Sequence, residues 1–331
     1  MRKPALTDSW ILGGLEIRNR VTLAPLAGIG NWFVRLQARR HGAGLVVSEM
    51  VSSFAVHYGN PRTCDELLRI HPDEHAMGPV AVQLFGHQPD VMRSAAERVA
   101  AAGADIIDLN MGCPVPKVCK TGAGAALLRD HDRAVAVARA AHEGSGLPIT
   151  VKLRPGQKPG DREGVTLAHR LVHEAGVVGL AFHPRHVSQQ HKGLPDYELA
   201  RALVEELPVP VTISGGLRDA DTVRRVFEHT GAAAVMLARG SLGNPWLFAE
   251  VLGRRATPPT AAEVLDELDW LFEAAADHLG PERAARYLRK FYPWYLRWLN
   301  VPQAVADGLQ RCDDLTLARS LLREGALTAA R

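Results

Sequence analysis

The sequence predicts a (β/α)8 barrel, the TIM-barrel architecture, followed by a C-terminal helical domain. Eight short apolar runs recur through the first three quarters of the chain, and amphipathic stretches of helical spacing separate most of them. Several of these stretches end in a glycine just before the next apolar run, where glycine takes the left-handed position past a helix without strain. Strand, helix and glycine stop, repeated to a count of eight, is typical of a closed barrel of parallel strands.

The expected strands are short runs of apolar and β-branched residues, such as VAVQLF and VTIS. Between them Ala, Leu and Val recur at the i, i+3, i+4 spacing of an amphipathic helix, as at 91–102, 165–175 and 219–230. An open doubly wound sheet is the alternative, but it more often places a GxGxxG turn after its first strand, where this chain has APLAGIGNW. The expected strands are 21–24, 45–48, 80–85, 106–110, 149–153, 179–183, 211–214 and 234–238.

Two segments outside the repeat set the domain limits. WILGGLEIRNR alternates around Gly13 and Gly14 and predicts a small hairpin that covers the floor of the barrel. Strand signals stop near residue 254, where RRATPPT carries two prolines and is typical of a linker. We therefore predict a barrel catalytic domain at 1–253 and a helical domain at 254–331.

Composition excludes several classes of protein. The chain has 331 residues, of which 47% are hydrophobic, and a formal net charge of only +3, which excludes global disorder. No window is long and apolar enough for a membrane helix, and the first residues lack the apolar run of a signal peptide. The four cysteines form no CxxC pair and no zinc-binding spacing, so we expect free thiols, no metal and a cytoplasmic setting.

Polar residues inside the predicted strands mark the candidate site. Catalytic groups in such barrels come from the carboxyl ends of the strands and the loops that follow. Gln83, Lys152 and His183 lie near three of these ends, and a polar group buried there without a partner is costly. Each alone is equally consistent with a satisfied core residue or a rim ion pair. Together they indicate a shared ligand.

The seventh and eighth predicted strands end in glycine-rich turns, at 214–216 and 238–240. Such turns bring backbone N–H groups and a helix N-terminus, expected here near Asp219 and Leu242, up to an anion. Phosphate sites in barrels commonly follow these two strands, and Arg239 adds a positive charge. We expect a phosphorylated cofactor: flavin mononucleotide (FMN) fits, and so does a sugar phosphate.

Cys113 is the most specific single candidate for a catalytic residue. It follows a strand end at Asn110 and lies between Gly112 and Pro114, which imply a sharply turned, rigid loop. A thiol there can act as nucleophile, metal ligand or proton donor. A reference pKa of about 8.5 keeps it mostly protonated near pH 7, which favours a general acid, whereas a nucleophile needs a nearby base or cation. We interpret the other three cysteines as structural.

The segment DLNMGCPVPKVCKTGAGAALL (108–128) resembles the active-site segment of tRNA-dihydrouridine synthases, and it is the most specific of the matching motifs. The resemblance covers roughly 20–250 strongly and extends more weakly to RKFYPWYL (289–296). The supporting motifs are APLAG (24–28), GAGLVVSEM (42–50), VQLFG (82–86), VKLR (151–154), HPRHVSQ (183–189) and ARGSLGNPWLF (238–248).

The resemblance implies an FMN-containing barrel with a helical tRNA-binding domain. The implied reaction reduces the C5–C6 bond of particular tRNA uridines with NADPH (or NADH) by way of FMN, hydride going to C6 and a proton from Cys113 to C5. It places Asn110, Lys117 and Arg185 at the substrate, with no membrane and no obligate protein partner. The cofactor residues that it implies are Pro25, Leu26, Ala27, Gln83, Lys152, His183, Ser214, Gly215, Gly216, Ala238 and Arg239.

Three places depart from the family pattern. His-Pro-Arg-His at 183–186 stands for His-Gly-Arg-Thr, Ser214 stands for Asn, and His191 stands where Tyr is frequent. Flavin binding is expected all the same.

A basic, aromatic segment in the tail is the candidate RNA contact. Residues 283–298 hold five Lys or Arg, among them Arg286, Arg289 and Lys290, interleaved with aromatic residues and without an acid. Basic groups contact phosphates, and aromatic faces can stack on bases. For the aromatic residues we favour inward packing, and for the basic face we favour RNA contact.

Three other functions fit parts of the sequence. A flavin barrel reductase of a free small molecule needs no basic tail. A non-catalytic RNA-binding barrel leaves Cys113, Lys152 and the two phosphate turns without a purpose. A Schiff-base aldolase that uses Lys152 leaves Cys113 unexplained.

Overall fold

The computed structural model describes residues 3–329, and the chain divides between Arg239 and Gly240 into two compact units. This division falls ahead of the linker predicted at 254–260, so helix α10 (Leu247–Val251) belongs to the helical unit and not to the barrel domain expected at 1–253. The preceding turn packs there too, because the indole of Trp298 donates a 2.7 Å hydrogen bond to the carbonyl of Gly243. The outermost residues of both predicted domains, 1–2 and 330–331, lie outside the described residues.

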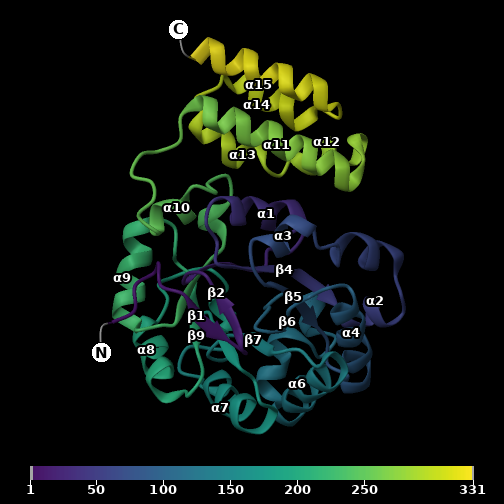
Figure 1. Ribbon diagram of the computed structural model, residues 1–331, viewed down its shortest axis with the longest axis vertical. Helices are drawn as coiled ribbons and strands as arrows, with labels where there is room; N and C mark the ends of the chain where they lie inside the picture. The colour runs from purple at the N-terminus through teal and green to yellow at the C-terminus, as the bar shows by residue number, and fades with distance from the viewer. Residues whose placement is uncertain (1–2, 330–331) are drawn as a thin grey trace. The chain divides into compact units, whose positions relative to one another are not determined.

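Eight parallel strands close into a barrel, which confirms the predicted fold class (Figure 1). Closure is made by β10, which pairs with β9 on one side and with β3 on the other. All eight predicted strands are present. Their bounds are β3 (Val21–Leu23), β4 (Leu45–Ser52), β5 (Val80–Phe85), β6 (Ile106–Met111), β7 (Ile149–Leu153), β8 (Gly179–Phe182), β9 (Val211–Ser214) and β10 (Ala234–Leu237).

Amphipathic helices surround the strands (Figure 1). In the helix before β10, Val223, Val226 and Phe227 are buried at the spacing that the sequence predicts, and Gly231 ends the helix in the left-handed conformation at φ 64°. The helices are α1 (Trp32–Arg40), α4 (Pro89–Ala101), α6 (His131–Ser145), α7 (Glu163–Ala175), α8 (Tyr197–Glu206) and α9 (Ala220–Thr230), with short turns α5 (Pro116–Cys119), η2 (Gly124–Arg129), η3 (Val187–Gln189) and η4 (Arg239–Ser241).

A short insertion between β4 and β5, which the sequence pattern did not predict, supports the loop after β3. It comprises α2 (Ser53–His57), η1 (Thr63–Leu67) and α3 (Pro72–Ala76). Glu74 of α3 is fully buried and accepts two hydrogen bonds, of 2.7 and 3.0 Å, from the Arg35 guanidinium. Arg35 also donates to the carbonyl of Gly30 at 3.0 Å. This buried ion pair therefore fixes the end of the first loop at the barrel mouth.

The predicted hairpin covers the floor of the barrel. Strands β1 (Trp10–Leu12) and β2 (Leu15–Ile17) pair antiparallel, and their apolar side chains pack on residues that begin the barrel strands, such as Leu45 and Ala234. Gly179 opens β8 beneath the hairpin, where a Cβ would come 2.5 Å from a methyl carbon of Leu12. The hairpin thus covers the floor, and the loops that carry the predicted site residues follow the carboxyl ends of the strands at the opposite end of the barrel.

The helical unit builds its own core from aromatic residues. Phe291, Tyr292 and Tyr295 are buried, as favoured for the aromatic residues of the tail, whereas Tyr287, Trp294 and Trp298 are half-buried. No helix among residues 3–329 is long and apolar enough to cross a membrane. After α10 the elements are α11 (Ala261–Leu279), α12 (Pro281–Leu288), α13 (Tyr292–Tyr295), η5 (Leu296–Trp298), α14 (Gln303–Arg311) and α15 (Leu315–Ala329).

Candidate active site

Parallel pairing aligns polar residues of β5, β6 and β7 in the barrel wall. Gln83 is the register partner of Asp108, and Asp108 is the partner of Thr150. Two residues further along each strand, Asn110 pairs with Lys152. Because residues i and i+2 of a strand share a face, these five side chains point to one side of the wall. The predicted site residues Gln83, Asn110 and Lys152 are thereby brought together.

The aligned polar groups satisfy one another. Asp108 accepts 2.7 Å from the Thr150 hydroxyl and 2.6 Å from the Gln83 amide. Gln83 in turn accepts 2.9 Å from the Asn110 amide nitrogen. Gln83 is fully buried, and both ends of its amide are engaged within the protein, which leaves it one N–H for the flavin contact predicted from the resemblance. Burial raises the pKa of Asp108, and the bonds from Thr150 and Gln83 oppose that effect.

Cys113 lies half-buried in the loop after β6, held at both its backbone groups. Its N–H donates 2.9 Å to the side-chain oxygen of Asn110, and its carbonyl accepts from the N–H of Ala125 and the thiol of Cys119. The thiol of Cys113 is free and lies within electrostatic range of Lys152 and Arg154. It is therefore on the side of the barrel that carries the predicted cofactor residues.

Cationic and imidazole side chains gather at the ends of β7 and β8. Burial, and then the charges of Lys152 and Arg154, hold the pKa of His183 far below the ordinary imidazole value. Burial, and then Arg239, lower the pKa of His191 to about 4. Burial, and then Arg154, lower the pKa of Lys152 to about 8. No carboxylate of the described residues counters these effects on the two histidines, so neutral rings stand among cations and the cluster favours an anion.

The loop after β8 is fastened by two buried arginines. Arg154 donates to the carbonyl oxygens of Arg185, His186 and Gln190 at 2.9–3.3 Å. Arg185, predicted at the RNA, is buried, and its guanidinium contacts His183 and donates to the carbonyl of Gly193. The structure thus places Arg185 inside the loop that carries His183 and His191.

The turn after β9 passes very close to His183. Gly215 and Gly216 have φ values of 93° and 81°, which side chains rarely adopt. A Cβ at Gly215 would lie 2.3 Å from a carbon of the His183 ring, and one at Gly216 would lie 2.6 Å from the Tyr197 hydroxyl. Ser214, just before them, is buried and donates to the carbonyl of Phe182. The two glycines thus let the backbone approach His183 and Tyr197 closely, and we call this turn, beside the cationic cluster, the glycine turn.

The remaining predicted cofactor residues lie after β3 and β10. Pro25 is half-buried, Leu26 is buried and Ala27 is exposed, and their loop is fixed where the N–H of Gly28 donates 2.7 Å to Glu49. Ala238 and the exposed Arg239 follow β10. The short helix expected near Leu242 is instead the turn η4, and α10 begins only at Leu247, because Gly243 takes φ 60° and interrupts the chain between them.

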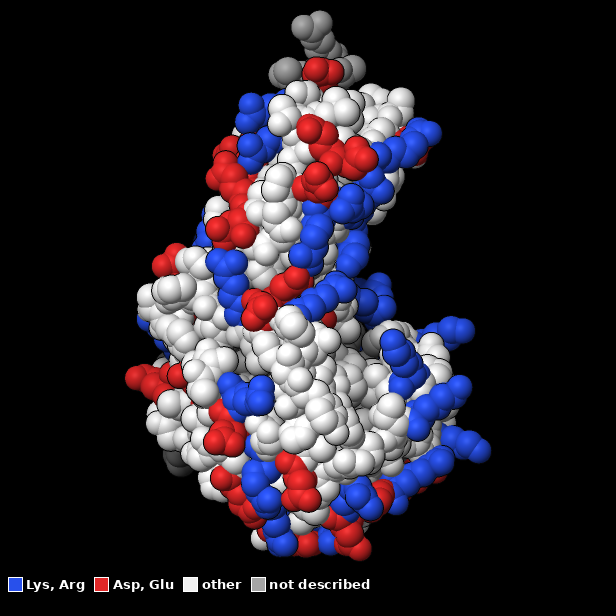
Figure 2. All heavy atoms as spheres, turned by 90° about the vertical axis from the view of Figure 1, so that its right-hand side faces the viewer, with Lys and Arg blue, Asp and Glu red and all other residues white. Residues whose placement is uncertain are grey.

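The predicted RNA contacts differ in exposure. Lys117, on the turn after Cys113, is exposed, and so are Arg286 and Lys290 in the helical unit. Arg289 is half-buried, and its guanidinium donates to two backbone carbonyls. One belongs to Arg311, the last residue of α14, and the other to Cys312, which follows it. Figure 2 shows a band of Lys and Arg crossing the face of the helical unit, with Asp and Glu beside it.

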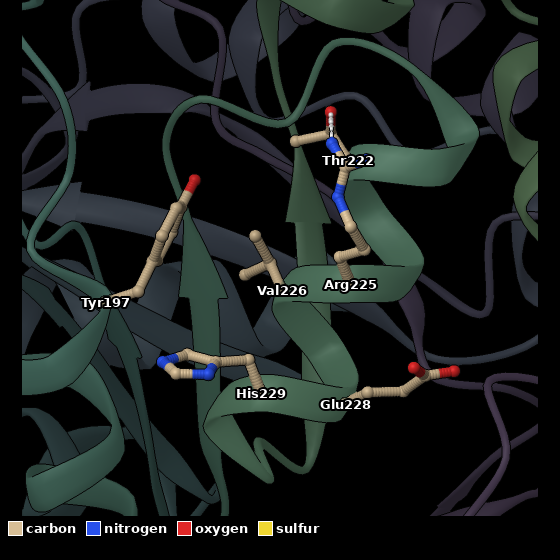
Figure 3. Close-up of a pocket in the computed structure, with 6 residues that line it drawn as sticks. All are labelled: Tyr197, Thr222, Arg225, Val226, Glu228 and His229. Atoms are coloured by element: carbon tan, nitrogen blue, oxygen red, sulfur yellow. Dashed lines mark hydrogen bonds between the residues drawn. The ribbon is translucent and has the colours of Figure 1, made fainter.

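A separate hollow of about 600 Å³ lies outside the barrel wall, between α8 and α9 (Figure 3). It is wide open, and His229 on its wall forms an ion pair of 2.8 Å with Glu198. The Tyr197 hydroxyl points away from His229, toward the carboxyl ends of the strands, where it donates to the carbonyl of Gly215 (Figure 3). Tyr197 thus connects this wall to the glycine turn.

The donor set fits a phosphorylated flavin. A dianionic phosphate needs cations and backbone N–H groups, and the cluster around Arg239 with the Gly215–Gly216 turn contains both kinds of group. An isoalloxazine ring needs an apolar wall and one cation at its polar edge, which the Pro25–Ala27 loop and Lys152 supply.

Sequence reasoning missed Asp108 and Tyr197 as site residues. Asp108 gave a signal, since it is an acid inside the apolar run IIDLN. Tyr197 gave none, because its role depends on how α8 meets the turn after β9.

The family assignment rests on sequence comparison. The family model described as Dihydrouridine synthase (Dus) matches residues 22–331. The chain is 38% identical over 293 residues to tRNA-dihydrouridine synthase B of Pseudomonas aeruginosa, covering 87% of each chain. It is 36% identical to the enzyme of the same name from Yersinia pestis, covering 86% of this chain and 89% of that one.

Solved structures share the barrel at lower identity. Morphinone reductase in complex with tetrahydroNAD superposes with a TM-score of 0.58 at 18% identity, covering 78% of this chain and 94% of that one. The old yellow enzyme homologue of Zymomonas mobilis gives a TM-score of 0.60 at 15% identity, covering 77% of this chain and 94% of that one. These likenesses concern the fold alone. The match to the family model and the sequence relatives show that the chain belongs to the dihydrouridine synthase family.

Proposed function

We propose that this protein reduces the C5–C6 bond of uridines in tRNA to dihydrouridine, with FMN as its bound cofactor, NADPH as reductant and Cys113 as proton donor. Family membership supports the reaction, and the curated relatives are named for tRNA as their substrate. A reaction on tRNA also places the protein in the cytoplasm.

The observation that carries the proposal is the fixed position of Cys113 in the loop after β6, near the cations that end β7. Its backbone N–H and carbonyl are both hydrogen-bonded, and its thiol lies within electrostatic range of Lys152 and Arg154. This arrangement suits proton transfer to a flat base that is held beside the cationic cluster.

Reduction of uracil adds a hydride at C6 and a proton at C5. When bound, FMN would supply the hydride at C6, with NADPH as the source of its electrons. Cys113 donates its S–H proton to C5 as negative charge develops there, and the thiolate then regains a proton from solvent. Atoms and charge therefore balance, since one hydride and one proton add across one double bond.

The surrounding side chains bind and orient. Lys152, Arg239 and the glycine turn would hold the negative charge of the cofactor, and His183, whose pKa burial lowers far below the ordinary value, would act as a neutral hydrogen-bonding group. The uridine must leave its stack to reach this depth, at a cost of a few kcal/mol that contacts to the rest of the tRNA have to offset.

The direct test uses purified protein, FMN, NADPH and an unmodified tRNA transcript. Dihydrouridine is measured by mass analysis of the digested nucleosides. We expect uridine to gain two hydrogen atoms in the transcript, and free uridine or a small enone to remain unreduced under the same conditions. Reduction of the free small molecule without reduction of tRNA overturns the proposal.

Cys113→Ala tests the role of the thiol, with Cys119→Ala as the matched control from the same loop. We expect Cys113→Ala to remain yellow and to oxidise NADPH slowly, with little or no dihydrouridine formed. The Cys119 thiol contacts backbone groups of its own loop, the carbonyl of Cys113 and the amides of Ala125 and Ala126, and so Cys119→Ala should retain most of the activity. Full activity of Cys113→Ala removes Cys113 from the mechanism.

A further inference from the structure

A continuous chain of hydrogen bonds runs from Asp108, deep in the barrel wall, to the backbone of Cys113. The N–H of Cys113 donates 2.9 Å to Oδ1 of Asn110, and Nδ2 of Asn110 donates 2.9 Å to Oε1 of Gln83. Nε2 of Gln83 then donates 2.6 Å to Oδ2 of Asp108. Four residues from two neighbouring strands and one loop thus form a single relay.

The two ends of this relay fix its direction. An ionised carboxylate can only accept hydrogen bonds, and a backbone N–H can only donate them. Each amide in between has one donating and one accepting end, so only one orientation of Gln83 and one of Asn110 satisfies every contact. The N–H of Gly112 also donates to Oδ1 of Asn110, at 3.3 Å, which adds a second donor at the same end.

Burial of the Asp108 carboxylate in the barrel wall costs free energy of folding. Asp108 is 2% exposed, and burial raises its pKa. The Thr150 hydroxyl donates to its other oxygen at 2.7 Å, and the Lys152 ammonium favours its charged form. A neutral apolar residue would fill the same space without this cost. The position is therefore explained best by a task that only an acceptor can perform.

We propose that Asp108 is a positioning residue that holds the Cys113 loop in place through Gln83 and Asn110. The catalytic consequence rests on the proposed function, because it concerns the thiol that protonates the base. The structural consequence does not, because it concerns only the amides of Gly112 and Cys113.

Two variants of Asp108 test the relay. Asp108→Leu removes both acceptor oxygens at nearly constant size, so Nε2 of Gln83 loses its buried acceptor and the inner end of the relay is no longer held. Asp108→Asn is the conservative variant, because its amide oxygen can accept from Gln83 while its N–H₂ donates to the Thr150 hydroxyl, which can accept as well as donate. The relay is therefore lost in Asp108→Leu and kept in Asp108→Asn.

Hydrogen exchange of the Gly112 and Cys113 amides, followed by mass spectrometry of overlapping peptides, is the first measurement. We expect these amides to exchange about tenfold faster or more in Asp108→Leu than in the native protein, and at close to the native rate in Asp108→Asn. Thr150→Val is the matched control, because it removes the other bond to Asp108 and leaves the relay intact. It should destabilise the barrel without speeding exchange at Cys113. Equal exchange in Asp108→Leu and native protein, or equal acceleration in Thr150→Val, overturns the proposal.

The conservative variant separates the acceptor oxygen from the bulk of the side chain. Native-like exchange in Asp108→Asn beside fast exchange in Asp108→Leu shows that the acceptor holds the loop, and equal exchange in the two variants refutes the relay. Should Asp108→Leu fail to fold, Asp108→Ala replaces it in the same comparison, because it removes the acceptor without adding an apolar side chain.

Catalysis supplies a second and separate readout. In Asp108→Leu we expect the kcat for dihydrouridine formation to fall at least tenfold, since the thiol is displaced, and we expect Asp108→Asn to retain most of it. Fast amide exchange in a variant of native activity keeps the structural relay and refutes its catalytic consequence. Absence of dihydrouridine formation even in the native protein refutes the proposed function and leaves the exchange result standing.

Discussion

The hydroxyl of Tyr197 donates a 2.7 Å hydrogen bond to the carbonyl oxygen of Gly215. Burial raises the pKa of this hydroxyl, so it stays protonated and able to donate. The bond joins the first residue of α8 to the glycine turn after β9. At the neighbouring Gly216 a Cβ would lie 2.6 Å from the Tyr197 hydroxyl oxygen, so there is no room for a side chain. Tyr197 thereby fixes the direction in which the N–H groups of the turn point.

Removing this hydroxyl should weaken FMN binding. In Tyr197→Phe we expect the Kd for FMN to rise about fivefold, which corresponds to the loss of one hydrogen bond worth about 1 kcal/mol. Fluorescence titration of the FMN-free protein measures the effect. Tyr58→Phe, which alters a side chain that is 75% exposed, serves as control and should leave the Kd unchanged. Native affinity in Tyr197→Phe would show that the turn holds its shape without the bond.

Gly215→Ala should disrupt the glycine turn after β9 and with it the proposed phosphate site. The residue has φ 93°, and its Cβ would lie 2.3 Å from the His183 ring, so the turn or the ring must move. Gly231→Ala is the matched control, because Gly231 has φ 64° with nothing within 4 Å of its Cβ. The control should lose about 1 kcal/mol of stability from backbone strain alone and keep FMN. Gly215→Ala should lose more stability in denaturant unfolding and lose bound FMN. Retention of FMN at native affinity would place the phosphate elsewhere.

Lys152 should make FMN binding depend on pH. Burial and Arg154 lower its pKa to about 8, so its positive charge is lost as the pH rises through that value. Because the charged form attracts an anion, we expect the Kd for FMN to rise above about pH 8 in the native protein. In Lys152→Arg the guanidinium stays charged, and this rise should disappear. In Lys152→Met binding should be weak and independent of pH over the same range. A native Kd that stays constant between neutral and alkaline pH would contradict the role given to Lys152.

The strands and their order could be predicted from the sequence because the signals are local. An apolar run such as VAVQLF, a helix of 3.6-residue period and a glycine stop such as Gly231 each act within a few residues. Repetition of that unit leaves a closed barrel as the natural arrangement. The strand ends then place Cys113, Lys152 and His183 at one end of the molecule.

The finer geometry depends on contacts that no local signal encodes. The pairing of Gln83 with Asp108 follows from strand register, which is set by the whole barrel. Arg185 carries a charge that predicts exposure, yet the loop folds over it and pairs it with the carbonyl of Gly193. Arg289 was expected at the RNA in the same way and instead donates to the carbonyls of Cys312 and Arg311.

The basic segment of the tail therefore divides into two kinds of residue. Arg286 and Lys290 are exposed, whereas the guanidinium of Arg289 is engaged with carbonyls at the end of α14. We expect Arg286→Glu and Lys290→Glu each to weaken tRNA binding and to lower the slope of log affinity against log salt concentration, since each removes a cation available to phosphate. Fluorescence anisotropy with labelled tRNA over a series of salt concentrations measures both quantities.

Arg289→Glu should act mainly on stability. Loss of its charged hydrogen bonds to the two carbonyls should cost the folded protein about 1.5–3 kcal/mol, seen as a lower midpoint of denaturant unfolding. Arg201→Glu, on α8 of the barrel unit, is the control for charge reversal and should change neither tRNA affinity nor its salt slope. If Arg286→Glu and Lys290→Glu bind tRNA as the native protein does while Arg201→Glu does not, the RNA surface lies on the barrel. In that case the exposed Lys and Arg side chains of the helical unit only keep its surface solvated.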